Sequence, residues 1–273
     1  MKYRPLGRSA LQVSVLCLGT MNFGPETSEE DSHEIMDRAH EVGINFFDTA
    51  NVYGWQQGEG ITEQIIGRWF AQGGGRREKT VVATKLYGSM SDWPNDTFLS
   101  ARNIRHACDA SLRRLQTDYI DLYQLHWPSR NVPIFGNNAF DPAAERPSVA
   151  IEDTLAALGK LVDEGKIRHI GVSNESSWGV SEFIKQSEMK GLPRIATIQN
   201  LYNLTARLNA PMPAGVTLSG TFAAPPGATS LGAIALTALR ERWGSVGQGD
   251  RLVVCHHSGH LMCLSRIAWS ASS

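Results

Sequence analysis

The 273-residue chain has no excess of either charge sign, few cysteines and no long apolar run. Its 26 Lys and Arg residues balance 27 Asp and Glu residues, for a net charge of −1. Because nucleic-acid phosphates are bound by basic surfaces, we expect no nucleic-acid partner. Four scattered cysteines are too few for the disulfide framework of a secreted domain. No apolar run reaches the length of a membrane span, and the first residues lack a signal-peptide core, so the sequence predicts a cytoplasmic protein without a membrane partner.

Short apolar runs alternate with amphipathic segments of helical period, which is typical of βα units around a parallel sheet. A small hairpin is expected over residues 2–13. The predicted strands are 13–19, 44–48, 81–85, 119–126, 167–174 and 194–200, and the predicted helices are 27–42, 62–72, 99–115, 149–166 and 177–188. Six recognisable βα units in succession predict an α/β protein with a (β/α)₈ TIM barrel rather than an open sheet.

The pattern changes after Arg207. Residues 208–273 contain six of the 53 charged residues, no Lys and no Tyr, and are rich in Ala, Gly and Pro. One helix, over about 231–243, is the only element expected there. We therefore expect an incomplete barrel over residues 1–207, followed by an irregular tail over 208–273. A barrel that lacks two strands would have open edges.

Polar residues stand where consecutive predicted strands end. Asp48, Lys85 and His126 end the second, third and fourth strands, and Tyr53 lies in the loop after Asp48. Ser173 with Asn174, and Gln199 with Asn200, end the next two. Any one of these could be a helix cap or a buried hydrogen-bonding group, but carboxyl ends of barrel strands converge on one mouth, where barrel active sites lie.

The residue types at this mouth suit one reaction. A phenol titrates near ~10 and donates a proton at neutral pH only when a cation stabilises its anion, which Lys85 would do beside Asp48. Neutral His126 would orient a carbonyl oxygen, and Tyr53 would protonate it. A cofactor must supply the hydride, because no side chain can. The amides and the hydroxyl of Ser173, Asn174 and Gln199 are groups that would hold a nicotinamide carboxamide.

These motifs resemble those of the aldo-keto reductase family, in the bacterial oxidoreductase branch that is related to potassium-channel beta subunits. The resemblance covers about residues 2–207 and is carried by LGTMNFG (18–24), GINFFDTANVYG (43–54), TK (84–85), LRRLQTDYIDLYQLHWP (112–128), GKIRHIGVSN (165–174) and TIQNLYNLTAR (197–207), together with Glu63 and Ile66-Gly67. It implies an NADPH-dependent reductase of aldehydes or ketones.

The resemblance also implies a role for each matched residue. Asp48, Tyr53, Lys85 and His126 would form the catalytic tetrad, with Tyr53 as general acid and a small carbonyl compound as substrate. The residues implied to bind NADPH (NADP⁺) are Thr20, Met21, Asp48, Ser173, Asn174 and Gln199. A homo-oligomer is compatible with the sequence.

The sequence departs from the family after the sixth strand. Two family features are not recognisable there. One is a Tyr-Ser-Pro-Leu-like motif, whose aromatic ring stacks on the nicotinamide in the family. The other is a later segment whose Ser, Lys and Arg groups bind the adenosine phosphate. This departure suggests a shifted reading frame or a divergent terminus, and it predicts weak NADPH binding. The alternatives are a non-catalytic cofactor-sensing or regulatory barrel and an inactive truncated reductase.

Two cysteines and three histidines crowd into CHHSGHLMC (255–263). Their spacing is not that of a zinc module, and they lie in the atypical tail. We expect no metal site.

Overall fold

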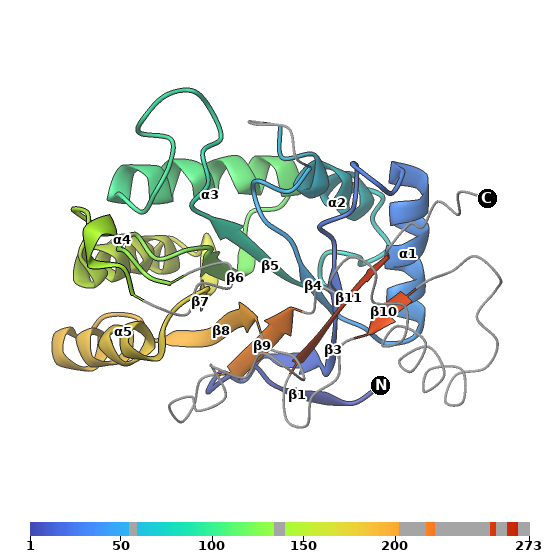
Figure 1. Cartoon of the computed structure of the whole chain (residues 1–273). Coiled ribbons are helices and arrows are strands. Elements are labelled where there is room, and N and C mark those ends of the chain that lie inside the picture. Colours follow the sequence, from blue (N-terminus) through green and yellow to red (C-terminus); the bar gives the residue numbers. More distant parts are fainter. Residues whose placement is uncertain (55–58, 134–139, 202–216, 222–251, 255–260, 267–273) are drawn as a thin grey trace.

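The computed structural model describes residues 1–54, 59–133, 140–201, 217–221, 252–254 and 261–266 (Figure 1). Its strands are β1 (Tyr3–Pro5), β2 (Gln12–Ser14), β3 (Leu16–Gly19), β4 (Phe46–Asp48), β5 (Val81–Leu86), β6 (Ile120–Leu125), β7 (Ile167–Ser173), β8 (Ile195–Leu201), β9 (Thr217–Thr221), β10 (Leu252–Val254) and β11 (Leu261–Arg266). Its α-helices are α1 (Glu29–Glu41), α2 (Ile61–Ala71), α3 (Ala101–Leu115), α4 (Ile151–Asp163) and α5 (Ser177–Lys190), and a 3₁₀ turn, η1, covers Pro142–Ala144.

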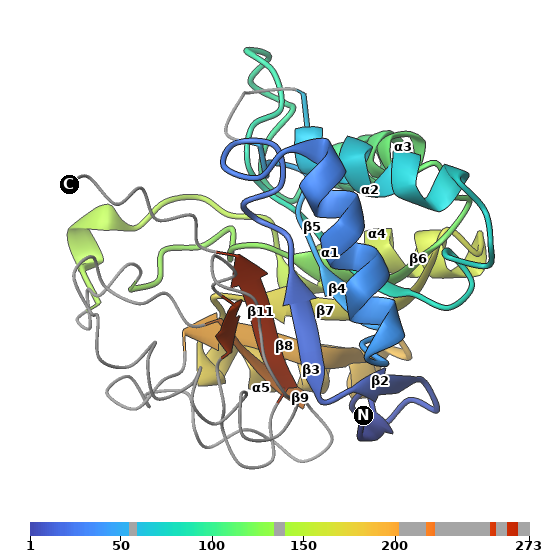
Figure 2. The ribbon, with the colours of Figure 1, turned by 90° about the vertical axis from the view of Figure 1, so that its right-hand side faces the viewer.

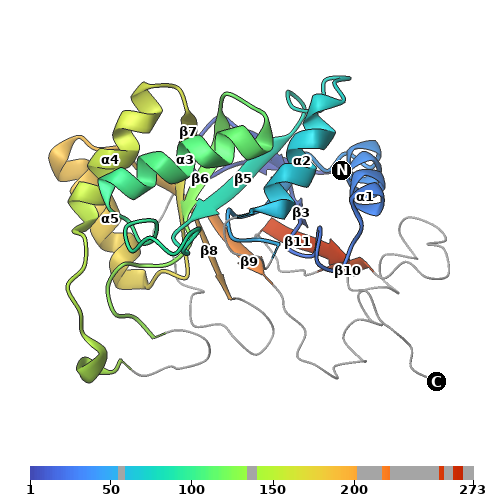
Figure 3. The ribbon, with the colours of Figure 1, turned by 90° about the horizontal axis from the view of Figure 1, so that it is seen from above.

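The predicted barrel fold is confirmed. Strands β3 to β8 pair in parallel in chain order, and a helix follows each of β3, β4, β5, β6 and β7. These helices lie on the outer side of the strands, as Figure 3 shows. Among the described residues, no helix follows β8.

The sequence predicts that two barrel strands are missing, whereas the structure has strands from the tail, β9 and β11, between β8 and β3. β9 pairs in parallel with β8 and with β11, and β11 pairs in parallel with β3. Figure 2 shows β11 beside β3. The strand ladder therefore runs around a ring, and β10 adds an antiparallel strand to β11. The expected helix over 231–243 and residues 255–260 of the Cys/His cluster lie outside the described residues.

Local sequence explains where the helices begin. The side chain of Ser28 accepts a hydrogen bond from the backbone N–H of Asp31 (3.1 Å), and three acids occupy the first turn of α1. Ser100 and Ser176 cap α3 and α5 in the same way. Such caps satisfy backbone donors that a helix end leaves free, and the acids suit the positive end of the helix dipole.

The core has two parts, on the two faces of the strands. Outward-facing residues such as Phe47 and Tyr123 pack against the helices, around the fully buried Trp69 of α2. Inward-facing residues such as Phe46 and Leu122 form the smaller cluster inside the barrel. The hairpin β1–β2 contributes Leu6, Val13 and Leu11 to this inner cluster. Apolar side chains thus fill the interior, and polar side chains follow nearer the carboxyl ends of the strands.

Candidate active site

Asp48 is the last residue of β4 and is buried, with 4% of its surface exposed. Thr20, which follows β3, donates its hydroxyl (2.8 Å) and its backbone N–H (3.1 Å) to the Asp48 carbonyl oxygen. Two residues before Asp48, Phe46 faces the interior. Strand alternation therefore turns the Asp48 carboxylate into the barrel mouth.

Lys85 connects Asp48 to Tyr53. Its Nζ donates to Asp48 Oδ2 (2.8 Å), to the Thr49 carbonyl oxygen (2.8 Å) and to the Tyr53 hydroxyl oxygen (3.2 Å). The ammonium has three N–H groups, and these contacts use all three. Burial opposes the charge of Lys85, but the attraction of Asp48 and Tyr53 outweighs it and raises the pKa of Lys85. Lys85 is therefore a fixed cation against the phenol.

His126 follows β6, and its ring contacts that of Tyr53. The two ring centroids are 5.9 Å apart in an edge-on arrangement. Burial, aided by the positive charge of Lys85, lowers the pKa of His126 to about 3. The imidazole is thus neutral at physiological pH, and its ring N–H can donate a hydrogen bond.

The structure brings Ser173, Asn174 and Gln199 to the same mouth. The Ser173 hydroxyl donates to the Gln199 carbonyl oxygen (2.8 Å), and the Asn174 side-chain amide donates to the His126 carbonyl oxygen (2.9 Å). Gln199 Nε2 donates to Asp48 Oδ2 (3.2 Å). Met21 is 41% exposed, whereas Thr20 is fully buried and supports the backbone of Asp48. The ligand-binding roles implied for these residues stay predictions.

Sequence reasoning missed Gln124 of β6. This side chain is 1% exposed, and its Nε2 donates to Asp48 Oδ1 and to Gln199 Oε1, both at 3.3 Å. A signal was present in YIDLYQLH: Gln124 stands two residues before His126, so alternation places both side chains on the same face.

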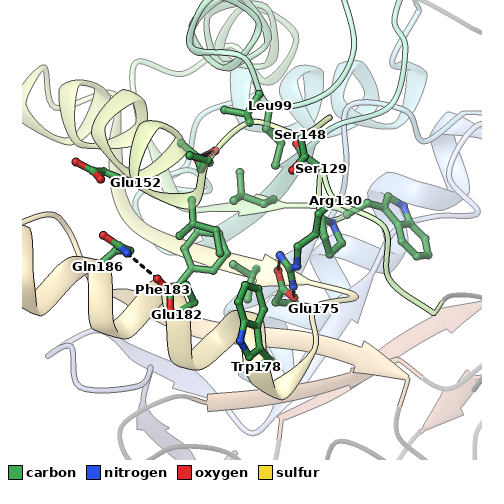
Figure 4. A pocket seen from close by; sticks show the side chains of 18 of the residues that line it. Leu99, Ser129, Arg130, Ser148, Glu152, Glu175, Trp178, Glu182, Phe183 and Gln186 are labelled. Atoms are coloured by element: carbon green, nitrogen blue, oxygen red, sulfur yellow. Dashed lines mark hydrogen bonds and ion pairs between the residues drawn. The ribbon is translucent and has the colours of Figure 1, made fainter. Parts of the chain in front are cut away.

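A separate cavity of about 580 Å³ lies on the helix side of β6 and β7, between α4 and α5. Leu125, Val172 and Phe183, which belong to the outer core, line it. Figure 4 shows Arg130 beside Glu175 and Trp178; the Arg130 guanidinium pairs with the Glu175 carboxylate (Nη1–Oε2 3.0 Å) and lies 4.9 Å from the Trp178 ring. The cavity therefore lies on the opposite face of these strands from Gln124.

Fold and site together define a (β/α)₈-type barrel with acid, ammonium, phenol and imidazole groups at the carboxyl ends of its strands. The chain belongs to the aldo/keto reductase family, whose model matches residues 15–212.

The relatives support the same assignment. The chain is 43% identical to "Protein tas" of Escherichia coli over 214 residues, which cover 76% of this chain and 62% of that protein. It is 44% identical to the "Uncharacterized oxidoreductase YrpG" of Bacillus subtilis over 211 residues, which cover 76% of this chain and 60% of that protein. This chain therefore spans less than two thirds of the length of these relatives. A crystal structure of a thermostable aldo-keto reductase with the inhibitor epalrestat shares the fold at a TM-score of 0.63 and 28% identity, covering 90% of this chain and 82% of that one.

Two negative findings apply to the described ranges alone. None of the helices there combines the length and hydropathy that a bilayer crossing requires. No three metal-ligating side chains gather there in a way that would hold an ion.

Proposed function

We propose that the chain is an NADPH-dependent oxidoreductase that reduces a small aldehyde or ketone to an alcohol, with Tyr53 as general acid. The carrying observation is the position of Lys85 Nζ, which contacts both Asp48 Oδ2 (2.8 Å) and the Tyr53 hydroxyl oxygen (3.2 Å). A fixed ammonium beside the hydroxyl stabilises the phenolate that remains once the phenol has given up its proton.

Each of these residues has one task in the reaction. Neutral His126 donates a hydrogen bond to the carbonyl oxygen and polarises the carbonyl. Tyr53 transfers its hydroxyl proton to that oxygen, and Lys85 stabilises the phenolate that remains. Asp48 holds the Lys85 ammonium in place. The nicotinamide, when bound, supplies the hydride to the carbonyl carbon, so that one hydride and one proton convert the carbonyl to an alcohol.

The donor set at the mouth fits the nicotinamide end of the cofactor. A carboxamide needs both donors and acceptors, and Ser173, Asn174 and Gln199 offer hydroxyl and amide groups from β7, the turn after it and β8. Asn174 has a left-handed backbone (φ 53°), and its side-chain amide donates to the main-chain carbonyl oxygen of His126 (2.9 Å).

Turnover tests the proposal directly. With NADPH and 4-nitrobenzaldehyde, we expect oxidation of NADPH by the parent chain and loss of turnover in Tyr53→Phe. Tyr3→Phe is the matched control, because it also removes a phenolic hydroxyl. The Tyr3 hydroxyl, near the amino terminus, donates a hydrogen bond to the Gly43 carbonyl oxygen (2.8 Å). An inactive parent chain that NADPH still stabilises would favour a cofactor-sensing barrel, and an inactive parent without such stabilisation would favour a truncated reductase.

We also propose that this chain binds NADPH weakly. The segment with Ser, Lys and Arg groups that the family resemblance implies for the adenosine phosphate is not recognisable in the sequence after residue 207. Charge-assisted contacts contribute on the order of 1.5–3 kcal/mol each, so their loss lowers affinity strongly. Fluorescence quenching measures the dissociation constant, and a value in the low micromolar range would contradict the proposal.

A further inference from the structure

Gln124 is a buried amide inside the barrel that the reaction above does not use. Its Nε2 donates to Asp48 Oδ1 and to Gln199 Oε1, each at 3.3 Å. Gln199 Nε2 in turn donates to Asp48 Oδ2 (3.2 Å). The three side chains come from β6, β4 and β8 and form a closed ring of hydrogen bonds.

The chemistry of Asp48 fixes how both amides are turned. An ionised carboxylate only accepts hydrogen bonds, so each glutamine must direct its nitrogen at Asp48. The second N–H of Gln124 is then available for the oxygen of Gln199. Gln124 therefore sets the orientation of Gln199 as well as holding the carboxylate.

The barrel interior leaves room for the Gln124 side chain at one glycine. Gly171 of β7 is the register partner of Gln124. A Cβ at Gly171 would lie 2.4 Å from Thr197 Oγ1, closer than real Cβ atoms approach other atoms, and 3.0 Å from Gln124 Cγ, which is tighter than most Cβ contacts. Because Gly171 has no side chain, the Gln124 side chain can extend alongside β7 to Gln199.

We propose that Gln124 is a positioning residue that couples Asp48 to Gln199. It keeps a neutral donor on the Asp48 carboxylate when Gln199 turns away to hold a carboxamide, so that Asp48 continues to fix Lys85 against Tyr53. This role rests on the proposed reductase function.

Two substitutions of Gln124 test the role. In Gln124→Leu the donors are lost and two buried acceptors, Asp48 Oδ1 and Gln199 Oε1, are left unsatisfied. We therefore expect kcat to fall about tenfold while KM for the aldehyde stays within about twofold. In Gln124→Glu the introduced carboxyl donates to Asp48 only while protonated, and the neighbouring carboxylate and burial raise its pKa. The kcat of this variant should approach that of the parent at about pH 5 and decrease towards about pH 8, whereas the kcat of the parent should show no such decrease.

Gln186→Glu on α5 is the matched control. Gln186 also donates to a carboxylate, Glu182 Oε1 at 2.6 Å, but it lies on the outer helix layer. Its kcat and pH profile should equal those of the parent. The role of Gln124 is overturned if Gln124→Leu retains the parent kcat, or if Gln124→Glu retains the parent pH profile.

A second readout separates this role from the proposed function. A parent chain without turnover overturns the reductase proposal and, with it, the catalytic effect of Gln124. The thermal midpoint of Gln124→Glu still decides whether position 124 contacts Asp48: relative to the parent, it should fall as pH rises from about 5 to 8, because an ionised pair of carboxylates is buried. If the thermal midpoint of Gln186→Glu falls by the same amount over this pH range, the contact between position 124 and Asp48 is overturned.

Discussion

Replacing Lys85 with Met removes the buried cation and keeps a side chain of similar length. In the folded protein, Lys85 Nζ contacts the Asp48 carboxylate, the Thr49 carbonyl oxygen and the Tyr53 hydroxyl. Lys85 is 1% exposed and Asp48 is 4% exposed, so water does not replace the lost partner. The variant leaves a buried carboxylate without its ammonium.

Removing one partner of a buried ion pair costs roughly 3–5 kcal/mol of unfolding free energy. The hydrogen bonds that the Gln199 and Gln124 side-chain amides donate to the Asp48 carboxylate, at 3.2 and 3.3 Å, remain in Lys85→Met. We therefore expect a cost at the lower end of this range, about 3 kcal/mol, at pH 8.

Urea unfolding at pH 8 measures the free energies. Lys185→Met is the matched control, because Lys185 is 58% exposed and pairs with Glu182 at 3.3 Å; its cost should stay below about 0.5 kcal/mol. The same Lys85→Met change in an Asp48→Asn background should cost less, since no carboxylate is left uncompensated. A cost below about 1 kcal/mol at pH 8, or an equal cost in both backgrounds, would refute the reasoning.

Two further predictions concern a titration and a helix contact. Between about pH 3 and 6.5, His126 is protonated in the unfolded chain and neutral in the folded chain. The contribution of His126 to the unfolding free energy therefore rises by about 1.4 kcal/mol per pH unit in this window, and it is lost as the pH falls. His126→Gln should remove this slope in urea titrations from pH 4.5 to 7.5, and a curve parallel to that of the parent would contradict the assignment. Gly67→Ala should lower the unfolding free energy by about 1–3 kcal/mol, because its Cβ would lie 2.0 Å from the Arg114 carbonyl oxygen. Gly159→Ala, with its closest atoms at 3.3 Å, should be near neutral, and equal costs would argue against close packing of α2 on α3.

The sequence by itself determined the order of the regular βα units. Strand and helix periods depend on neighbouring residues, so 44–48 and 81–85 could be assigned before any contact was known. The Ser28 cap of α1 and the polar residues at successive strand ends followed from the same local patterns. Because carboxyl ends of parallel strands meet at one mouth, Asp48, Lys85 and His126 could be predicted to converge.

Only the tertiary structure decided what joins those residues. Lys85 meets Tyr53, and Asp48 meets Gln124 and Gln199, across separations of up to 151 positions in the chain. The pairing of β9 and β11 that extends the strand ladder around the ring also has no local signature, because residues 208–273 lack the apolar period that marks a strand. The low pKa of His126 comes from burial by surrounding elements and from the charge of Lys85. Local periodicity specifies which elements form, whereas pairing, burial and charge depend on atoms that are brought together only when the chain folds.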